Sequence, residues 1–224
     1  MERALADGEA AGGAGPLTPL PARAAGETRA KVLAAAIRPG DLGTMDTVAL
    51  TFDDGPYPET TPALLAALGG TRATFFLWGE HAAAHPDLVR AIAAAGHTIG
   101  NHTWTHPRLP TLPAAAREQE VRRTQDLLTR LTGIRPVLFR PPYGDTDSAV
   151  AETLAGQGLT EVLWSVDTRD WAGCSADEIV AAAGRAQPGG IVLMHEGRPA
   201  TLDAVPRILA ALAARGLRPG PVRG

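Results

Sequence analysis

The chain has 224 residues, of which 45% are hydrophobic and 20% are charged, and this suffices for one buried core and one globular domain. Its 21 basic and 24 acidic side chains give a formal net charge of −3, and no run of Lys or Arg would follow a phosphate backbone, so we expect no nucleic-acid partner. No run of about 18 apolar residues occurs, so we expect neither a membrane-spanning helix nor a membrane partner.

Residues 1–44 are rich in Ala, Gly, Pro and Thr, which predicts a linker or loosely structured N-terminal extension. One short helix is expected there, at Thr28–Ile37. The first ten residues carry charges where a signal peptide has its apolar segment, so no export signal is visible in this chain. The single cysteine, Cys174, cannot form an internal disulfide, and we interpret it as a small, partly buried residue.

From Asp46 onward, strand and helix patterns alternate in six βα units. The expected strands are Thr47–Phe52, Ala73–Leu77, Thr98–Asn101, Val137–Arg140, Glu161–Val166 and Ile191–Met194. The expected helices are Thr60–Leu68, Pro86–Ala95, Ala114–Leu131, Asp147–Gln157, Ala176–Arg185 and Leu202–Arg215. This alternation predicts an α/β fold in which a parallel sheet curls into an incomplete barrel. No glycine-rich phosphate loop or dinucleotide fingerprint follows the first strand.

Two adjacent carboxylates, Asp53 and Asp54, follow the first expected strand in the segment Thr-Phe-Asp-Asp-Gly-Pro. They can serve as ordinary turn residues, because Asp-Gly-Pro is a common turn former. Successive side chains at a strand end also leave in different directions, so one carboxylate can bind a metal while its neighbour accepts a proton. The two residues alone leave both interpretations open.

Two histidines, His102 and His106, follow the third expected strand and are closed by Pro107. A histidine pair is often structural, but one helical turn would bring these two imidazoles to the same side. Together with one Asp they make three ligands, the usual protein complement of a catalytic zinc that keeps an open position. The spacing therefore predicts a metal site.

Arg140 ends the fourth expected strand and precedes Pro-Pro-Tyr-Gly. The segment is either a rigid turn with a surface arginine, or a cation paired with a site carboxylate beside stiffened amides, at Tyr143 and Gly144, that face an oxyanion. Asp170 and His195 lie near the ends of the last two expected strands. A lone histidine there would be a core residue, whereas a neighbouring Asp would raise its pKa and suit it to act as an acid.

Because the carboxyl ends of parallel strands meet on one rim, these five segments are expected to converge into a metallohydrolase site. In this order they resemble the motifs of the polysaccharide deacetylases (NodB-homology domain, carbohydrate esterase family 4), over about residues 46–216. The resemblance implies a distorted (β/α)7-type barrel in a single domain at 45–218, followed by a tail at 219–224. It also implies one divalent metal ion, zinc first and cobalt second.

The resemblance assigns the site residues to three groups. The metal ligands are Asp54, His102 and His106. The catalytic residues are Asp53 as general base, Arg140 as its partner, His195 as general acid and Asp170 as the residue that tunes His195. The substrate-binding residues are Tyr143, whose amide would face the oxyanion, and Trp171 and Leu193, which would surround the acetyl methyl.

The implied substrate is an acetylated poly- or oligosaccharide that contains N-acetylglucosamine, such as a chitin oligomer or peptidoglycan. An O-acetyl esterase acting on xylan would use the same residues. A non-catalytic carbohydrate-binding module is disfavoured, because it has no need of Asp53 and His195 together. The resemblance further implies a secreted or cell-wall-associated protein, and we expect a monomer. The last segment, 216–224, is rich in Pro and Gly and is expected to make a poor strand, which leaves barrel closure at that end open.

Overall fold

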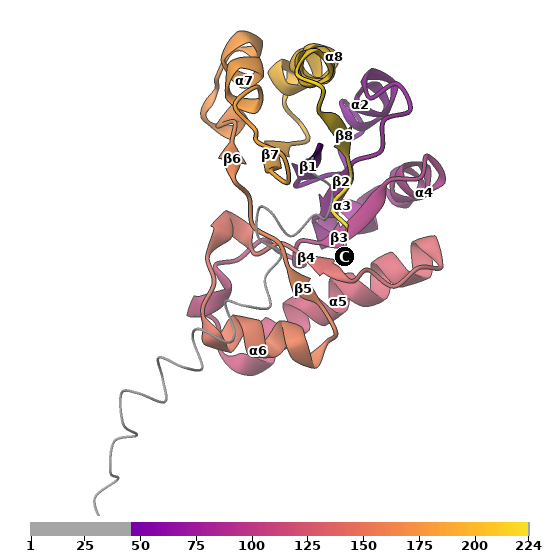
Figure 1. The fold of residues 1–224 in the computed structure, drawn as a ribbon. Coiled ribbons are helices and arrows are strands. Elements are labelled where there is room, and N and C mark those ends of the chain that lie inside the picture. Colours follow the sequence, from indigo (N-terminus) through magenta and orange to yellow (C-terminus); the bar gives the residue numbers. More distant parts are fainter. Residues whose placement is uncertain (1–45, 224) are drawn as a thin grey trace, which may run out of the picture.

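Parallel strands form one curled sheet in the computed structural model, which describes residues 46–223 (Figure 1). The strand order is β5-β4-β3-β2-β1-β7-β6, and β8 pairs with β1 outside this path. The strands are β1 (Thr47–Asp53), β2 (Thr74–Leu77), β3 (Thr98–Asn101), β4 (Leu138–Phe139), β5 (Thr160–Glu161), β6 (Val166–Asp167), β7 (Ile191–His195) and β8 (Arg218–Gly220). The expected parallel α/β sheet in an incomplete barrel is confirmed, whereas the helix expected at Thr28–Ile37 lies outside the described residues.

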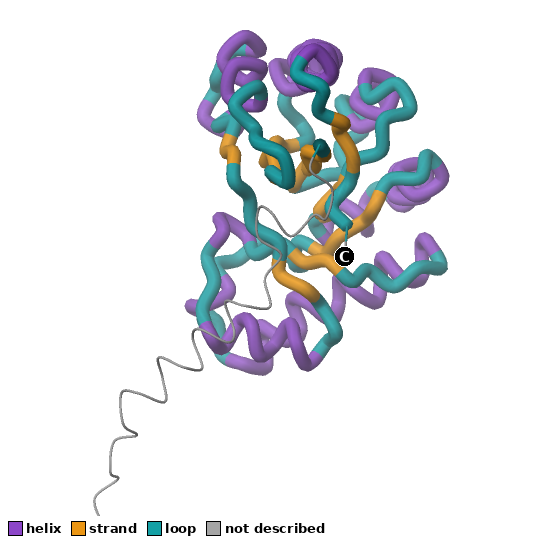
Figure 2. The backbone as a smooth tube through the Cα atoms, in the orientation of Figure 1, coloured by secondary structure: helices purple, strands orange, loops and turns teal. Residues whose placement is uncertain are grey.

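Helices surround the strands on the outside of the sheet (Figure 2). They are α2 (Thr61–Ala67), α3 (Gly79–Ala84), α4 (Pro86–Ala94), α5 (Ala114–Thr132), α6 (Ser148–Gly156), α7 (Ala176–Ala183) and α8 (Pro199–Ala214). The loops of residues 46–223 contain three short 3-10 helices: η1 (Leu109–Thr111), η2 (Pro142–Gly144) and η3 (Asp170–Ala172). The six expected helices are all present, and α3 is an additional one. Within residues 46–223, no helix has the length and apolar character needed to cross a bilayer.

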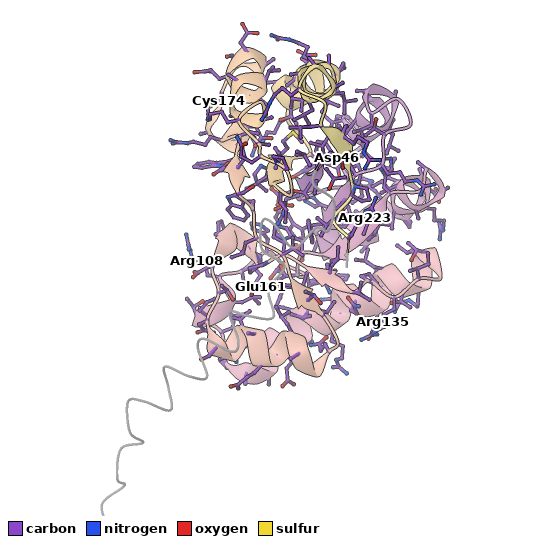
Figure 3. All side chains as sticks on the ribbon, viewed as in Figure 1. Asp46, Arg108, Arg135, Glu161, Cys174 and Arg223 are labelled. Carbon is purple, nitrogen blue, oxygen red and sulfur yellow. The ribbon has the colours of Figure 1, made fainter. Side chains whose placement is uncertain are left out.

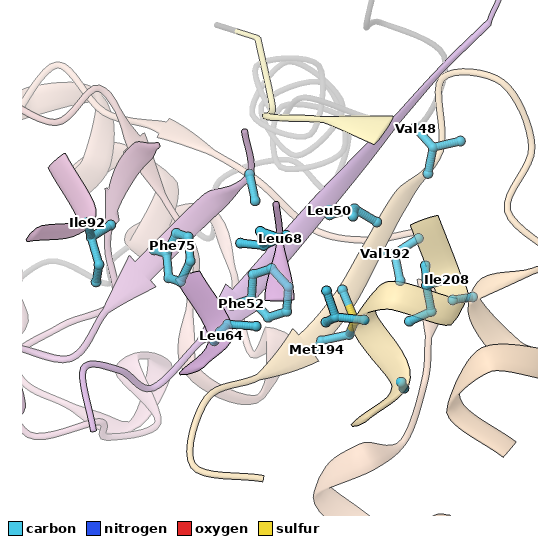
Figure 4. Packing of buried hydrophobic residues seen from close by; sticks show 14 of the residues in the cluster. Val48, Leu50, Phe52, Leu64, Leu68, Phe75, Ile92, Val192, Met194 and Ile208 are labelled. Carbon is cyan, nitrogen blue, oxygen red and sulfur yellow. The ribbon is translucent and has the colours of Figure 1, made fainter. Parts of the chain in front are cut away.

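The alternation of side chains along β1 decides what faces the interior of the barrel. Val48, Leu50 and Phe52 pack in the larger core between the sheet and its helices (Figure 4). Ala49 packs in a separate cluster that includes Phe76. Asp53 is an even number of residues from Ala49, so its side chain leaves the strand on the same face. Its carboxylate therefore points to the inner side at the carboxyl end of β1.

The expected strand Glu161–Val166 is wrong as a single element, because it is divided between β5 and β6 at opposite ends of the sheet order. The chain between them crosses the opening of the barrel (Figure 1). Arg140 donates from Nε to the carbonyl of Val162 at 3.2 Å and from Nη2 to the carbonyl of Leu163 at 3.4 Å. These two carbonyls accept hydrogen bonds from the buried guanidinium instead of continuing the pairing of a β-strand. The barrel is therefore open at this segment.

A short strand does form at the end of the chain, where the composition predicted poor strand material and left barrel closure open. Arg218–Gly220 forms β8, whose first residue lies opposite Thr47 of β1. The Arg218 amide donates to the Asp46 carbonyl at 2.7 Å, and its side chain pairs with the Asp46 carboxylate. Pro219 is tolerated because the strand is only three residues long and pairs with β1 alone among the described strands. The segment expected as a tail also buries Val222, which is 3% exposed.

Cys174 is partly buried and packs against the larger core, as expected for a small filler residue, in the loop that precedes α7 (Figure 3).

Candidate active site

Asp54, His102 and His106 bring three potential metal-ligand atoms within 4.8 Å of one another. Asp54 Oδ1 lies 3.4 Å from His102 Nε2 and 3.3 Å from His106 Nε2. This oxygen is buried and makes no hydrogen bond. A buried carboxylate oxygen without a donor is costly unless a cation meets it, so the three residues fit a divalent ion with an open coordination position.

The ionised form of Asp54 is favoured despite its burial. Burial alone would raise the pKa of Asp54, but the imidazoles of His102 and His106 outweigh it and hold that pKa well below its usual range. A metal ligand must be deprotonated, and this carboxyl group meets that condition.

The two histidines are brought together by a loop and not by the helical turn that their spacing predicts. Residues 102–106 contain no helix, and the backbone is left-handed at Thr103 (φ 69°) and at His106 (φ 60°). Left-handed non-glycine residues each cost on the order of 1–3 kcal/mol and persist only where surrounding contacts hold them. Asn101 supplies one such contact, because its Oδ1 accepts the Thr103 amide at 2.9 Å.

The ring orientation of His102 is fixed by a hydrogen bond on the side of the ring away from Asp54. Its Nδ1–H donates to the carbonyl of Arg140 at 2.7 Å. The proton therefore resides on Nδ1, which leaves the lone pair of Nε2 directed toward Asp54 and available to a metal.

Asp53 forms a buried ion pair with Arg140, the pairing that the family resemblance implies. Arg140 Nη1 lies 2.8 Å from Asp53 Oδ1 and also donates to the Thr51 hydroxyl at 2.7 Å. The arginine side chain is 0% exposed and its guanidinium lies over the ring of Phe76. Burial lowers the pKa of Arg140, and the Asp53 carboxylate opposes that shift. The second oxygen of Asp53 points toward the metal site, 3.9 Å from His102 Nε2.

His195 and Asp170 form a second pair, and His195 is the register partner of Asp53 between β7 and β1. His195 Nδ1 lies 2.7 Å from Asp170 Oδ1, and Asp170 Oδ2 accepts the His195 amide at 2.7 Å and the Thr201 hydroxyl at 2.6 Å. Burial alone would lower the pKa of His195, but the hydrogen bond that its ring donates to Asp170 and the nearby carboxylates raise that pKa overall. Burial alone would raise the pKa of Asp170, and the contacts with His195 and Thr201 lower it overall.

One cavity of about 500 Å³ joins these groups. Tyr143, Trp171 and Leu193 line it together with Asp53, Asp54 and the three histidines, so every candidate group except the buried Arg140 and Asp170 faces one space. Tyr143 is 58% exposed and Trp171 is 48% exposed, which places two aromatic rings at its mouth. The Gly144 amide donates to the carbonyl of Pro141, which directly precedes η2, so of the two amides considered only that of Tyr143 remains a candidate for an oxyanion.

Several cavity residues are not predicted from the sequence. They are Arg108, Pro141, Trp164, Asp167 and Arg198. Asp167 belongs to the same short segment as Asp170 and accepts a hydrogen bond from Trp171 Nε1 at 3.3 Å. Its place in that segment is the sequence signal that could have identified it as a cavity residue. Trp164 lies under Gly144, where a Cβ would stand 2.8 Å from its ring. Arg108 projects outward at the edge of the molecule (Figure 3) and lies over the Tyr143 ring. Nothing in its sequence context except proximity to His106 indicates this.

Glu196 is a further residue that sequence patterns do not reveal. It is buried beside the turn at Gly55, where a Cβ would overlap its Oε1, and its other oxygen accepts from the Thr61 hydroxyl. Burial, together with the charge of Asp54, raises the pKa of Glu196 to about 8 despite the Thr61 hydrogen bond. Its amide donates to the Asp53 carbonyl at 2.9 Å, so it joins the ends of β1 and β7.

The amino-acid sequence of this chain is similar to a known protein family and to several characterised relatives. The profile of the family described as polysaccharide deacetylase matches residues 43–162. A peptidoglycan-N-acetylglucosamine deacetylase of Bacillus cereus is 40% identical over 178 residues, which cover 76% of this chain and 65% of that protein. A chitooligosaccharide deacetylase of Rhizobium leguminosarum bv. trifolii is 40% identical over 184 residues, which cover 75% of this chain and 86% of that protein.

A solved structure shares the fold. The family 4 carbohydrate esterase from Streptomyces lividans, determined in complex with acetate, superposes with a TM-score of 0.76 at 46% identity, and the match covers 78% of this chain and 92% of that one. The agreement extends over nearly the whole of the solved chain, so the curled barrel is shared and not only its first half.

Proposed function

This chain belongs to the polysaccharide deacetylase family, and from that premise we propose that it removes acetyl groups from glycans that contain N-acetylglucosamine, using a metal-activated water. The observation that carries the proposal is that the metal-ligand triad, the Asp53–Arg140 pair and the Asp170–His195 pair meet at one cavity. Each of the three supplies one part of the proposed amide hydrolysis, and they come from separate parts of the sequence.

Asp54, His102 and His106 would hold the ion, and we propose zinc, since two imidazoles and one carboxylate with an open position suit it. Cobalt is the alternative. When bound, the ion supplies Lewis acidity toward the acetyl carbonyl and acidifies water. The orphaned oxygen of Asp54 supports this assignment independently of any relative.

Asp53 is proposed as the general base. One of its oxygens is occupied by Arg140, and the other points toward the metal site, where the attacking water would lie. A carboxylate fixed in this way can accept the proton of the water as it attacks the carbonyl carbon. Arg140 then acts as a positioning residue, because it touches Asp53 and is fully buried away from the cavity.

His195 is proposed as the general acid. Because Nδ1 is engaged by Asp170, Nε2 is the ring atom that remains for the cavity. Its raised pKa favours the imidazolium, which can give a proton to the departing sugar amine. The Tyr143 amide is proposed to stabilise the oxyanion, and Trp171 with Leu193 to enclose the acetyl methyl. No covalent intermediate is needed.

The substrate proposal rests on the relatives and on the aromatic mouth of the cavity. The two curated relatives named above act on peptidoglycan and on chitooligosaccharides by their descriptions, and the Streptomyces lividans esterase was solved with acetate, the product of deacetylation. The exposed rings of Tyr143 and Trp171 can stack on sugar faces. We further propose a monomer that acts outside the cytoplasm or at the cell wall, where such polymers occur.

The decisive experiment measures acetate release from chitin oligomers, from peptidoglycan and from acetylated xylan, each with and without a chelator. Release from the first two that stops with chelator and returns with zinc supports the proposal. Release from xylan alone would replace it with O-acetyl esterase activity, for which the same residues suffice. No release from any substrate by metal-loaded protein would favour the non-catalytic binding module.

A further inference from the structure

A carboxylate outside the cavity binds the loop that carries both histidine ligands. Glu120 lies on α5, and its Oε2 accepts the amides of Trp104 at 2.9 Å and Thr105 at 2.8 Å. Its Oε1 accepts the Thr105 hydroxyl at 2.8 Å. One side chain therefore makes three hydrogen bonds to the two residues that stand between Thr103 and His106.

These hydrogen bonds hold the part of the loop whose backbone conformation is least favourable in free energy. The residues on either side of the Glu120 contacts, Thr103 and His106, are the two residues of this loop, 102–106, that adopt left-handed backbone conformations. Such conformations are unfavourable for Thr and His and require fixed neighbours. The amides of α3 bind the carbonyls of Thr103 and Trp104, at 2.8 and 3.1 Å, so the loop is held from one side through its carbonyls and from the other through its amides.

We propose that Glu120 is a positioning residue for the metal centre, which holds residues 102–106 in the conformation that binds the ion. Glu120 does not belong to the ligand triad, and both of its carboxylate oxygens accept hydrogen bonds from the loop. Without it, the amides of Trp104 and Thr105 turn to water and the loop samples conformations in which the imidazoles diverge. The apparent metal affinity then falls in proportion to the fraction of chains that remain competent. The proposal rests on the metal site put forward above.

The test is zinc affinity, measured on full-length metal-free protein by competition with a chromogenic chelator. Glu120→Ala is expected to weaken zinc binding by at least about tenfold, as loss of an outer contact of a metal site typically does. Glu118→Ala is the matched control, because Glu118 is exposed on the same helix and its loss removes the same charge. Glu120→Gln is expected to stay within about threefold of wild type, since its amide oxygen can accept both backbone amides and its nitrogen can donate to Thr105.

Glu120→Asp covers the case in which the alanine variant does not fold, because it keeps the charge and shortens the reach by one methylene. It should weaken zinc binding as alanine does, with unchanged circular dichroism. Cobalt absorption of each variant reports whether the same ligand set is retained at saturation. Zinc affinity of a folded Glu120→Ala or Glu120→Asp equal to that of Glu118→Ala would overturn the proposal, as would absence of zinc binding by wild type. A wild type that binds zinc but releases no acetate would instead refute the proposed function and leave the role of Glu120 standing.

Discussion

Asp170 holds His195 at two points, through the ring at 2.7 Å and through the backbone amide at 2.7 Å, and so fixes both the position and the tautomer of the imidazole. The same carboxylate is anchored by the Thr201 hydroxyl of α8. An imidazole held in this way keeps one nitrogen for the cavity and gains a higher pKa from its partner.

This pair gives a pH prediction. Asp170→Asn removes the charge that raises the His195 pKa, so the imidazolium should lose its proton at lower pH. The alkaline limb of the kcat/KM profile should therefore move to lower pH in a folded, metal-loaded variant. An unchanged alkaline limb would show that His195 is not the acid.

Metal content and rate should separate at the two adjacent carboxylates. Asp53→Asn should retain nearly normal metal, because Asp53 is outside the triad, and should lose about two to four orders of magnitude in kcat. Asp54→Asn should lose the metal itself. Elemental analysis beside acetate release distinguishes the two, and equal metal loss in both would mean that their roles are divided wrongly.

Chelation should abolish activity, and added zinc or cobalt should restore it. His102→Ala should remove metal and activity together, because it deletes a ligand and also vacates the hydrogen bond to the Arg140 carbonyl. Full activity of protein from which the metal has been stripped, verified by elemental analysis, would contradict the assignment.

The Asp53–Arg140 pair should also contribute to folding stability. Arg140→Met leaves Asp53 buried without its cation and is expected to cost about 3–5 kcal/mol in the free energy of unfolding. The double variant with Asp53→Asn should recover part of that loss, because no uncompensated charge remains. Denaturant unfolding of the single and double variants measures the coupling, and strict additivity would argue against the pair.

Glu196 should make stability depend on pH. Its pKa in the folded chain is about 8, above the ordinary 4.5, so the protonated form is favoured by folding. The contribution is fully present below pH 4.5, and it is lost progressively as pH rises toward 8 and the unfolded chain alone ionises. Glu196→Gln should therefore gain stability relative to wild type between pH 5 and pH 8. A constant difference across that range would show that Glu196 is already ionised in the folded protein.

Most of the sheet and the residues at its rim could be predicted from the sequence. The β-branched and aromatic runs that form the strands, and the motifs that directly follow them, are both visible within a few consecutive residues. The family resemblance grouped Asp54 with His102 and His106, and the structure brings the three together, but the helical turn expected from the spacing of the two histidines is wrong. The left-handed conformations at Thr103 and His106 are imposed by contacts from α3 and α5, which a spacing of four residues cannot reveal.

The division of the expected strand Glu161–Val166 has the same kind of cause. Whether these residues form one strand or two depends on a guanidinium more than 20 positions away, which takes up two of their carbonyls. The strand β8 likewise depends on Asp46 and Thr74, which offer partners to the Arg218 and Val222 amides. The local composition of this segment does not favour a strand, but hydrogen-bond partners far away in the sequence stabilise one.

Arg140 binds Asp53 of β1 and, at the same time, the two carbonyls of the segment that crosses the barrel opening. A single cation therefore links the proposed base to the segment that carries Trp164 into the lining of the cavity. Redesign of residues 162–165 to admit a bulkier glycan would shift the guanidinium and move the carboxylate with it, so specificity and turnover would change together. Arg108 lines the same cavity from its rim, where its side chain is 58% exposed, pairs with Asp145 and lies over the Tyr143 ring, so a substitution there would reach the proposed base less directly than a change in residues 162–165.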